Sequence, residues 1–148
     1  MTKNEVIEVL LIEDSDADAN LALRSLKKNH LANNLIRLED GEQALDFLFG
    51  KGEYQGRSVE NTPRVILLDL KMPKVDGIEV LKAIREDDRT KHIPVVVLTS
   101  SKEEQDIVKS YELGVNSYIV KPVDFQKFID SIKDIGLYWL VLNQPPKK

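Results

Sequence analysis

Four short runs of apolar residues constrain the fold of this chain more than any other feature. They span residues 6–12, 65–68, 95–98 and 118–120, they are rich in Val, Ile and Leu, and they mostly lack polar–apolar alternation. Strands that are covered by helices on both faces of a parallel sheet have this composition. A fifth, more mixed run at 35–38 is typical of a strand at the edge of such a sheet.

Apolar residues at helical spacing fill the segments between these runs. Their stripes comprise Ala19, Ala22, Leu23 and Leu26; Val80, Leu81 and Ile84; Ile107, Val108 and Tyr111; and Phe125, Phe128, Ile129 and Ile132. We expect a further helix over 41–49 that stops at Gly50. Gly114 is expected to end the helix before it, and Asp124 to cap the last helix.

The alternation of strand and helix, five times over, predicts an α/β fold with a doubly wound five-stranded parallel sheet. One common strand order for such sheets is 2-1-3-4-5, and its ligand site lies beyond the carboxyl ends of strands 1 and 3. We expect a single domain over 4–142, with a polar surface loop inserted at 50–63 between the second helix and the third strand. Residues 136–142 are expected to form an apolar extension of the last helix, and 143–148 a short tail.

Composition excludes several classes of protein. The chain has no cysteine, so disulfide scaffolds and thiolate chemistry are excluded and the cytoplasm is the default compartment. Its formal net charge of -4 is a poor match to nucleic acid. The apolar run near the start is too short and too acidic for a signal peptide or a membrane span. We therefore expect neither nucleic acid nor a membrane among the partners.

Side chains that can take part in chemistry follow four of the predicted strands. Glu13 and Asp14 follow the first, Asp69 the third, Thr99 the fourth and Lys121 the fifth. The carboxyl ends of parallel strands share one edge, so the three carboxylates converge if strands 1 and 3 are neighbours. Neighbouring carboxylates raise one another's pKa, and a hard cation such as Mg²⁺ relieves their repulsion. With a lysine and a hydroxyl beside them, they suit phosphoryl transfer.

Each of these residues also has an ordinary structural interpretation. The Glu13–Asp14 pair, like Asp16 and Asp18 after it, is suited to capping a helix and supplying charge to its first turn. Asp69 fits a cap or a solvated loop, Thr99 a local turn, and Lys121 a solvated surface. The functional interpretation is favoured because it explains all of the strand ends together.

Motifs around these strand ends extend the pattern to most of the chain. They read LLIEDSD, LLDLKMPKVDG, VVVLTSS and YIVKPVD. In them the sequence resembles a response regulator receiver domain of two-component signalling, which implies the flavodoxin-like order 2-1-3-4-5. The resemblance implies that Asp69 accepts a phosphoryl group from a histidine kinase. It also implies that Glu13, Asp14, Asp69 and the backbone carbonyl of Lys71 hold Mg²⁺.

The same resemblance implies roles for residues around the acceptor. Lys121 would pair with the phosphoryl oxygens, and the Lys121–Pro122 peptide bond would be cis. Thr99 would hydrogen-bond the phosphoryl group and move toward it. Tyr118 would rotate inward as a switch, which we favour over a tyrosine that simply packs beside a helix.

Other positions follow from the family pattern. Lys71 and Ser101, each two residues beyond a site residue, would tune the lifetime of the aspartyl phosphate. Pro73 and Gly77 match the turn after the acceptor strand. The signal would leave through the face made by the fourth helix, the fifth strand and the fifth helix.

Among receivers, the sequence looks most like the single-domain regulators that partner phytochromes. The features are the long 50–63 loop, the phrase SYELGVNSYIVKPVDF and the helix extension GLYWL, after which no output domain is expected. We therefore expect a sensor histidine kinase as donor, of the phytochrome type or another, and a downstream protein or phosphotransfer partner. The LYWLVL run either packs on the 50–63 loop or makes a homodimer contact through Trp139 and Leu140, which we favour.

Motifs of three other protein classes are missing or altered in this sequence. Aspartyl-phosphate phosphatases carry a second Asp two residues after the nucleophile, where this chain has Lys71. A flavin protein needs a Ser/Thr/Gly-rich phosphate loop after the first strand, where this chain has EDSDAD. The Walker A motif of nucleotide hydrolases does not occur. A signalling protein rather than an enzyme is expected, and a phosphorelay intermediate or an unphosphorylated scaffold remain as alternatives.

Overall fold

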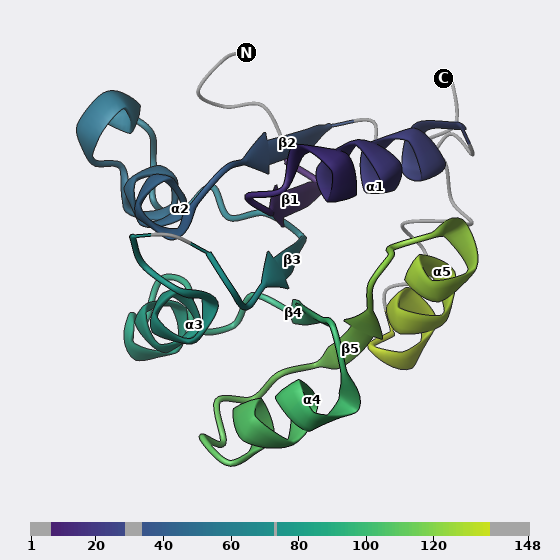
Figure 1. The fold of residues 1–148 in the computed structure, drawn as a ribbon. Helices are drawn as coiled ribbons and strands as arrows, with labels where there is room; N and C mark the ends of the chain where they lie inside the picture. The colour runs from purple at the N-terminus through teal and green to yellow at the C-terminus, as the bar shows by residue number, and fades with distance from the viewer. Residues whose placement is uncertain (1–6, 29–33, 73, 137–148) are drawn as a thin grey trace.

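A computed structural model describes residues 7–28, 34–72 and 74–136, and its elements alternate between strand and helix along the chain (Figure 1). The strands are β1 (Val9–Ile12), β2 (Leu35–Leu38), β3 (Val65–Asp69), β4 (Val95–Thr99) and β5 (Ser117–Val120). The helices are α1 (Asp16–Lys28), α2 (Gly41–Phe49), α3 (Gly77–Glu86), α4 (Lys102–Lys109) and α5 (Phe125–Asp134), with a short 3-10 helix η1 (Gly52–Tyr54).

The strands form one parallel five-stranded sheet in the order β2-β1-β3-β4-β5. This confirms the predicted fold class and strand order. Every residue of β1, β3 and β4 is buried, because helices cover both faces of the sheet. The edge strand β2 is largely half-buried, in keeping with its mixed sequence.

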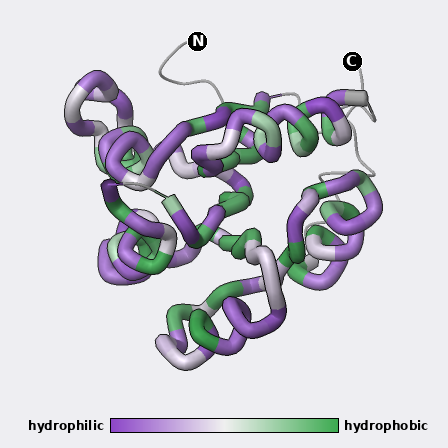
Figure 2. Tube along the Cα trace, in the orientation of Figure 1, coloured by the Kyte–Doolittle hydropathy of each residue, from purple (hydrophilic) through white to green (hydrophobic). Residues whose placement is uncertain are grey.

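Two apolar layers flank the sheet, because successive side chains of a strand point to opposite faces. One layer packs α1 and α5 on the face that carries Leu11, Leu67 and Val96. The other packs α2, α3 and α4 on the face that carries Leu10 and Ile66. Figure 2 shows the central strands as mostly hydrophobic, whereas the helices alternate between hydrophobic and hydrophilic residues.

Short polar side chains start four of the helices. The N-cap residues Asp40, Asp76, Ser101 and Asp124 each accept a hydrogen bond from the backbone N–H three residues on. Gly50 ends α2 in the left-handed conformation, with φ 65°. The predicted cap at Asp124 and the predicted stop at Gly50 are therefore confirmed.

The helix after β4 was only partly predicted. It ends at Lys109, so Tyr111 lies beyond it and Gly114 lies in the following loop rather than at the cap. Of the predicted stripe only Val108 is buried, whereas Ile107 is 55% and Tyr111 46% exposed. At the other end of the fold, the first strand begins at Val9, later than the apolar run that predicted it.

The 50–63 segment packs more closely than its polar sequence predicts. The Tyr54 ring meets the Phe47 ring edge-on, with centroids 5.1 Å apart. The Arg57 guanidinium lies 4.1 Å from the centroid of the same Phe47 ring. Arg57 also donates hydrogen bonds to the backbone carbonyls of Phe47, at 2.9 Å, and Asn61. One half-buried arginine thus joins the segment to α2.

A second arginine fastens the edge of the sheet where the strands begin. Arg85, at the end of α3, donates hydrogen bonds of 2.8–3.2 Å to the carbonyls of Lys91, Ile93, Leu113 and Gly114 and to the side-chain oxygen of Asn116. Its acceptors belong to the segments that enter β4 and β5. One side chain therefore joins three parts of the chain.

Some expectations concern residues outside the described part. These are the apolar extension with Trp139 and Leu140, the tail, and Pro73. The homodimer contact therefore remains a prediction. Among the described helices, none has the length and apolar character required to cross a membrane.

Candidate phosphoryl-transfer site

Three carboxylates meet at the edge of the sheet where the strands end. Ile12 pairs with Leu68, so Glu13 and Asp14 leave β1 beside Asp69, the last residue of β3. Glu13, Asp14 and Asp69 each offer an oxygen, and these oxygens all lie within 4.8 Å of one another. Glu13 and Asp69 are buried, whereas Asp14 is exposed. The predicted convergence is present, with one side open to solvent.

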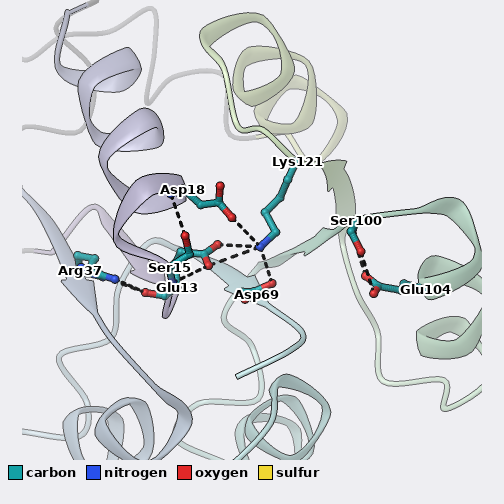
Figure 3. Close-up of polar contacts among 8 residues, drawn as sticks. All are labelled: Glu13, Ser15, Asp18, Arg37, Asp69, Ser100, Glu104 and Lys121. Carbon is teal, nitrogen blue, oxygen red and sulfur yellow. Dashed lines mark hydrogen bonds and ion pairs between the residues drawn. The ribbon is translucent and has the colours of Figure 1, made fainter. Parts of the chain in front are cut away.

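Lys121 places its ammonium among these groups (Figure 3). Its Nζ lies 3.1 Å from Asp69 Oδ1, 3.2 Å from Glu13 Oε1 and 3.3 Å from Asp18 Oδ2. The lysine follows β5, and its peptide bond to Pro122 is cis, as the resemblance implied. Lys121 thus extends from the end of β5 to the ends of β1 and β3.

Electrostatics at the cluster favour a cation. Burial, followed by the neighbouring Glu13, raises the pKa of Asp69 to about 7, although Lys121 acts in the opposite direction. Burial alone would lower the pKa of Lys121, but Asp69 and Glu13 outweigh it and raise that pKa. One ammonium leaves the carboxylates under-compensated. Carboxylate oxygens are the ligands that hard divalent cations take, so the residues fit such an ion.

The backbone around Asp69 is tightly packed. The Gly77 N–H donates to the Leu70 carbonyl at 2.8 Å. A Cβ at Gly77 would lie 2.4 Å from the Asp69 carbonyl oxygen and 2.7 Å from Leu70 Cα. Glycine at this turn therefore lets α3 begin directly against the strand that carries Asp69.

Thr99 ends β4 with an unused hydroxyl. The residue is fully buried, and within the described part of the chain its Oγ1 has no hydrogen-bond partner. Its carbonyl accepts the Lys121 N–H at 2.8 Å, which places it next to the residue that carries the ammonium. Such a hydroxyl can donate to an incoming anion without first losing a protein partner.

Tyr118 is half-buried on β5, and burial raises its pKa. The Lys109 ammonium lies 5.5 Å from the centroid of its ring. These contacts give Tyr118 a defined resting environment beside α4. Its rotation as a switch stays a prediction.

Lys71 and Ser101 lie on the two loops that border the acceptor. The Lys71 side chain is exposed and pairs with Glu104 at 3.1 Å. Ser101 is the N-cap of α4. An open cavity of about 480 Å³ lies alongside. Its lining residues are Asp14, Leu70, Lys71, Met72, Asp76, Ile78, Glu104 and Ile107.

The sequence interpretation of the first helix start was only partly right: Asp16 and Asp18 do lie in the first turn of α1, but neither the cap nor the role of Asp18 was predicted. Ser15, not the acidic residues around it, accepts the N–H of Asp18, at 3.1 Å. Asp18 itself pairs with Lys121 and so belongs to the site. Asp16 pairs with Arg37 at 2.9 Å, and Arg37 also donates to the Glu13 carbonyl, which fixes the turn after β1. No local sequence signal marked Asp18, because its partner Lys121 lies 103 residues away in the sequence.

Known proteins resemble the chain over most of its length. The family model for the response regulator receiver domain matches residues 9–133. FilR2 of Methanothrix harundinacea, described as a probable methanogenesis regulatory protein, is 42% identical over 138 residues, covering 93% of this chain and 86% of FilR2. The response regulator Rcp1 of Synechocystis sp. is 45% identical over 134 residues, covering 89% of this chain and 88% of Rcp1.

Solved structures agree with the fold. The bacteriophytochrome response regulator RtBRR superposes with a TM-score of 0.86 at 51% identity, covering 96% of this chain and 85% of that one. The Mn²⁺-bound form of Rcp1 superposes with a TM-score of 0.72 at 41% identity, covering 95% and 99%. The likeness includes the whole sheet and the helices on both of its faces.

Proposed function

Because the chain belongs to the response regulator receiver family of two-component signalling, we propose that Asp69 accepts a phosphoryl group from a sensor histidine kinase in a Mg²⁺-dependent reaction. One observation carries the assignment. Asp69 is the buried carboxylate that shares an edge with Glu13 and Asp14 and has the Lys121 ammonium 3.1 Å away. A carboxylate with a purely structural role would not require two further carboxylates and an ammonium beside it.

The chemistry follows from the placement of these groups. An Asp69 oxygen attacks phosphorus, the bond from phosphorus to the donor's imidazole nitrogen breaks, and its electron pair returns to the imidazole. Lys121 pairs with the phosphoryl oxygens, and the Thr99 hydroxyl donates to one of them. Glu13, Asp14, Asp69 and the Lys71 carbonyl would hold Mg²⁺, which offsets the charge of the phosphoryl oxygens.

The phosphoryl group changes the balance of charge at the edge of the sheet. It brings about two negative charges and three acceptor oxygens close to Lys121 and Thr99. Movement of these residues is transmitted to the face made by α4, β5 and α5. On this face Ile107 of α4 and Val120 of β5 expose apolar surface to a partner, as does Tyr111 in the loop after α4. The intact acidic cluster supports this signalling role over an unphosphorylated scaffold.

The donor we propose is a histidine kinase of the phytochrome type. RtBRR, at 51% identity, is described as a bacteriophytochrome response regulator, whereas FilR2 is described as a regulator of methanogenesis, so other sensors remain as the alternative. On this proposal the protein acts in the cytoplasm as a signalling protein rather than an enzyme. It would pass its state to a downstream protein, as a homodimer.

Intact-mass measurement tests the acceptor. The protein is incubated with acetyl phosphate and Mg²⁺, beside Asp69→Asn and the control Asp88→Asn, whose carboxylate is exposed and pairs with Lys91. We expect one phosphoryl adduct on the wild type and on the control, none on Asp69→Asn, and none after chelation of the metal. An undiminished adduct on Asp69→Asn would refute the assignment.

A further inference from the structure

A single carboxylate on α4 connects the two loops that border Asp69. Glu104 Oε1 accepts the Ser100 N–H at 2.8 Å, and its Oε2 accepts the Ser100 hydroxyl at 2.9 Å (Figure 3). The same Oε2 lies 3.1 Å from Lys71 Nζ. Ser100 belongs to the β4–α4 loop and Lys71 to the β3–α3 loop, so Glu104 bridges segments that are separate in sequence.

The local fold fixes Glu104 in this position. Its own N–H donates to the N-cap Ser101, so the side chain starts in the first turn of α4 and turns back over the loop. Only 13% of the side chain is exposed. The Ser100 N–H, against the effect of burial and with help from Lys71, holds the pKa of Glu104 below its usual range. The group is therefore a charged acceptor.

The two bridged residues are neighbours of the reacting groups. Ser100 directly follows Thr99, whose buried hydroxyl has no partner within the described residues. Lys71 lies two residues beyond Asp69. A Thr99 hydroxyl that moves to a phosphoryl group on Asp69 must carry the β4–α4 loop with it. The bonds of Glu104 oppose that movement, because they stabilise the loop in its present arrangement, in which the Thr99 hydroxyl has no partner among the described residues.

We propose that Glu104 is a positioning residue that ties the β4–α4 loop to Lys71 in the unphosphorylated protein and holds the receiver in its resting arrangement. The proposal rests on the proposed function of Asp69. Releasing the tie shifts the population toward the arrangement in which Thr99 meets the phosphoryl group. Phosphoryl uptake is then faster, because more molecules are ready for it.

Two substitutions break the tie with opposite changes of charge. Glu104→Gln removes a negative charge and Lys71→Met a positive one, so a purely electrostatic effect on metal or donor would move uptake in opposite directions. At saturating Mg²⁺ we expect both to raise the rate of uptake from acetyl phosphate roughly two- to five-fold, the range of an ion pair whose lysine is exposed to solvent. The double variant should match the singles, because both remove one interaction.

The exposed pair Asp88–Lys91, at 3.1 Å, supplies the control, and Asp88→Asn should leave uptake unchanged. Uptake that is unchanged or slower in either single variant, that moves in opposite directions in the two, or that is multiplied in the double variant, would overturn the proposal. If the wild type takes up no phosphoryl group, or Asp69→Asn still does, the proposed function itself fails, and this inference with it.

A second readout needs no phosphorylation. Hydrogen exchange of the Ser100 amide, followed by NMR, reports the bond to Glu104 directly. We expect faster exchange in Glu104→Ala and wild-type exchange in Lys71→Met, which leaves the Ser100 bonds in place. Equal exchange in Glu104→Ala and the wild type would show that the tie does not exist in solution.

Discussion

Replacing Arg57 by Met should destabilise the protein, because the guanidinium of Arg57 joins the 50–63 segment to α2. It lies 4.1 Å from the centroid of the Phe47 ring and donates to two backbone carbonyls, those of Phe47 and Asn61. Methionine keeps much of the apolar stem and cannot donate. The substitution therefore separates the polar contacts of Arg57 from its volume.

The magnitude follows from the contacts that are lost. A half-desolvated cation–π contact contributes about 0.5–2 kcal/mol. Each hydrogen bond from a charged donor contributes about 1.5–3 kcal/mol. Burial works against the charge, as the lowered pKa of Arg57 shows, and offsets part of this sum. We expect a loss of about 2–4 kcal/mol in the free energy of unfolding.

Urea unfolding followed by far-UV circular dichroism measures this loss. The matched control is Arg89→Met, since the guanidinium of the exposed Arg89 bonds at 2.8–3.0 Å to the carboxylate of the half-buried Asp87, two residues away. The control should change stability by less than about 0.5 kcal/mol. Phosphoryl uptake should survive in both variants. Equal unfolding midpoints for the two variants would refute the idea that Arg57 anchors the segment.

Two further substitutions test the acceptor edge. Thr99→Val removes a buried hydroxyl that has no partner among the described residues, so the variant should be about 1 kcal/mol more stable in thermal melts while its phosphoryl uptake slows; a less stable variant would contradict the unpaired hydroxyl. Gly77→Ala places a Cβ 2.4 Å from the Asp69 carbonyl oxygen, so it should cost about 1–3 kcal/mol in urea unfolding, and a neutral result would show that the turn can relax.

Most of the fold could be predicted because buried strands have a recognisable apolar sequence. The run at 65–68 is apolar throughout, as a strand covered on both faces must be, and β3 occupies it together with Asp69. The end of α4 could not be predicted in this way. Ile107 has helical spacing from other apolar residues, but it points to solvent, and spacing alone does not say which side of a short helix is covered.

The acidic cluster could be predicted because parallel strands end at one edge, so Glu13 and Asp69 must approach each other once β1 and β3 pair. The role of Asp18 could not, because its contact with Lys121 joins residues 103 apart in the sequence. Charge in a first helical turn is favourable in any helix, and this local explanation was sufficient for Asp18 without the site.

The hydrogen bonds of Arg85 make the two edges of the sheet mechanically unequal. Where the strands begin, one guanidinium clamps α3 to the entries of β4 and β5 through five acceptors. Where they end, Lys121 joins β5 to Glu13 and Asp69, but among the described residues the only ion pair from α4 to a neighbouring loop is Lys71 to Glu104. A displacement at Asp69 is therefore resisted more strongly at the edge where the strands begin than around α4 at the edge where they end. If Asp69 accepts a phosphoryl group as proposed, we therefore expect the resulting displacement to be concentrated where the strands end and to move α4.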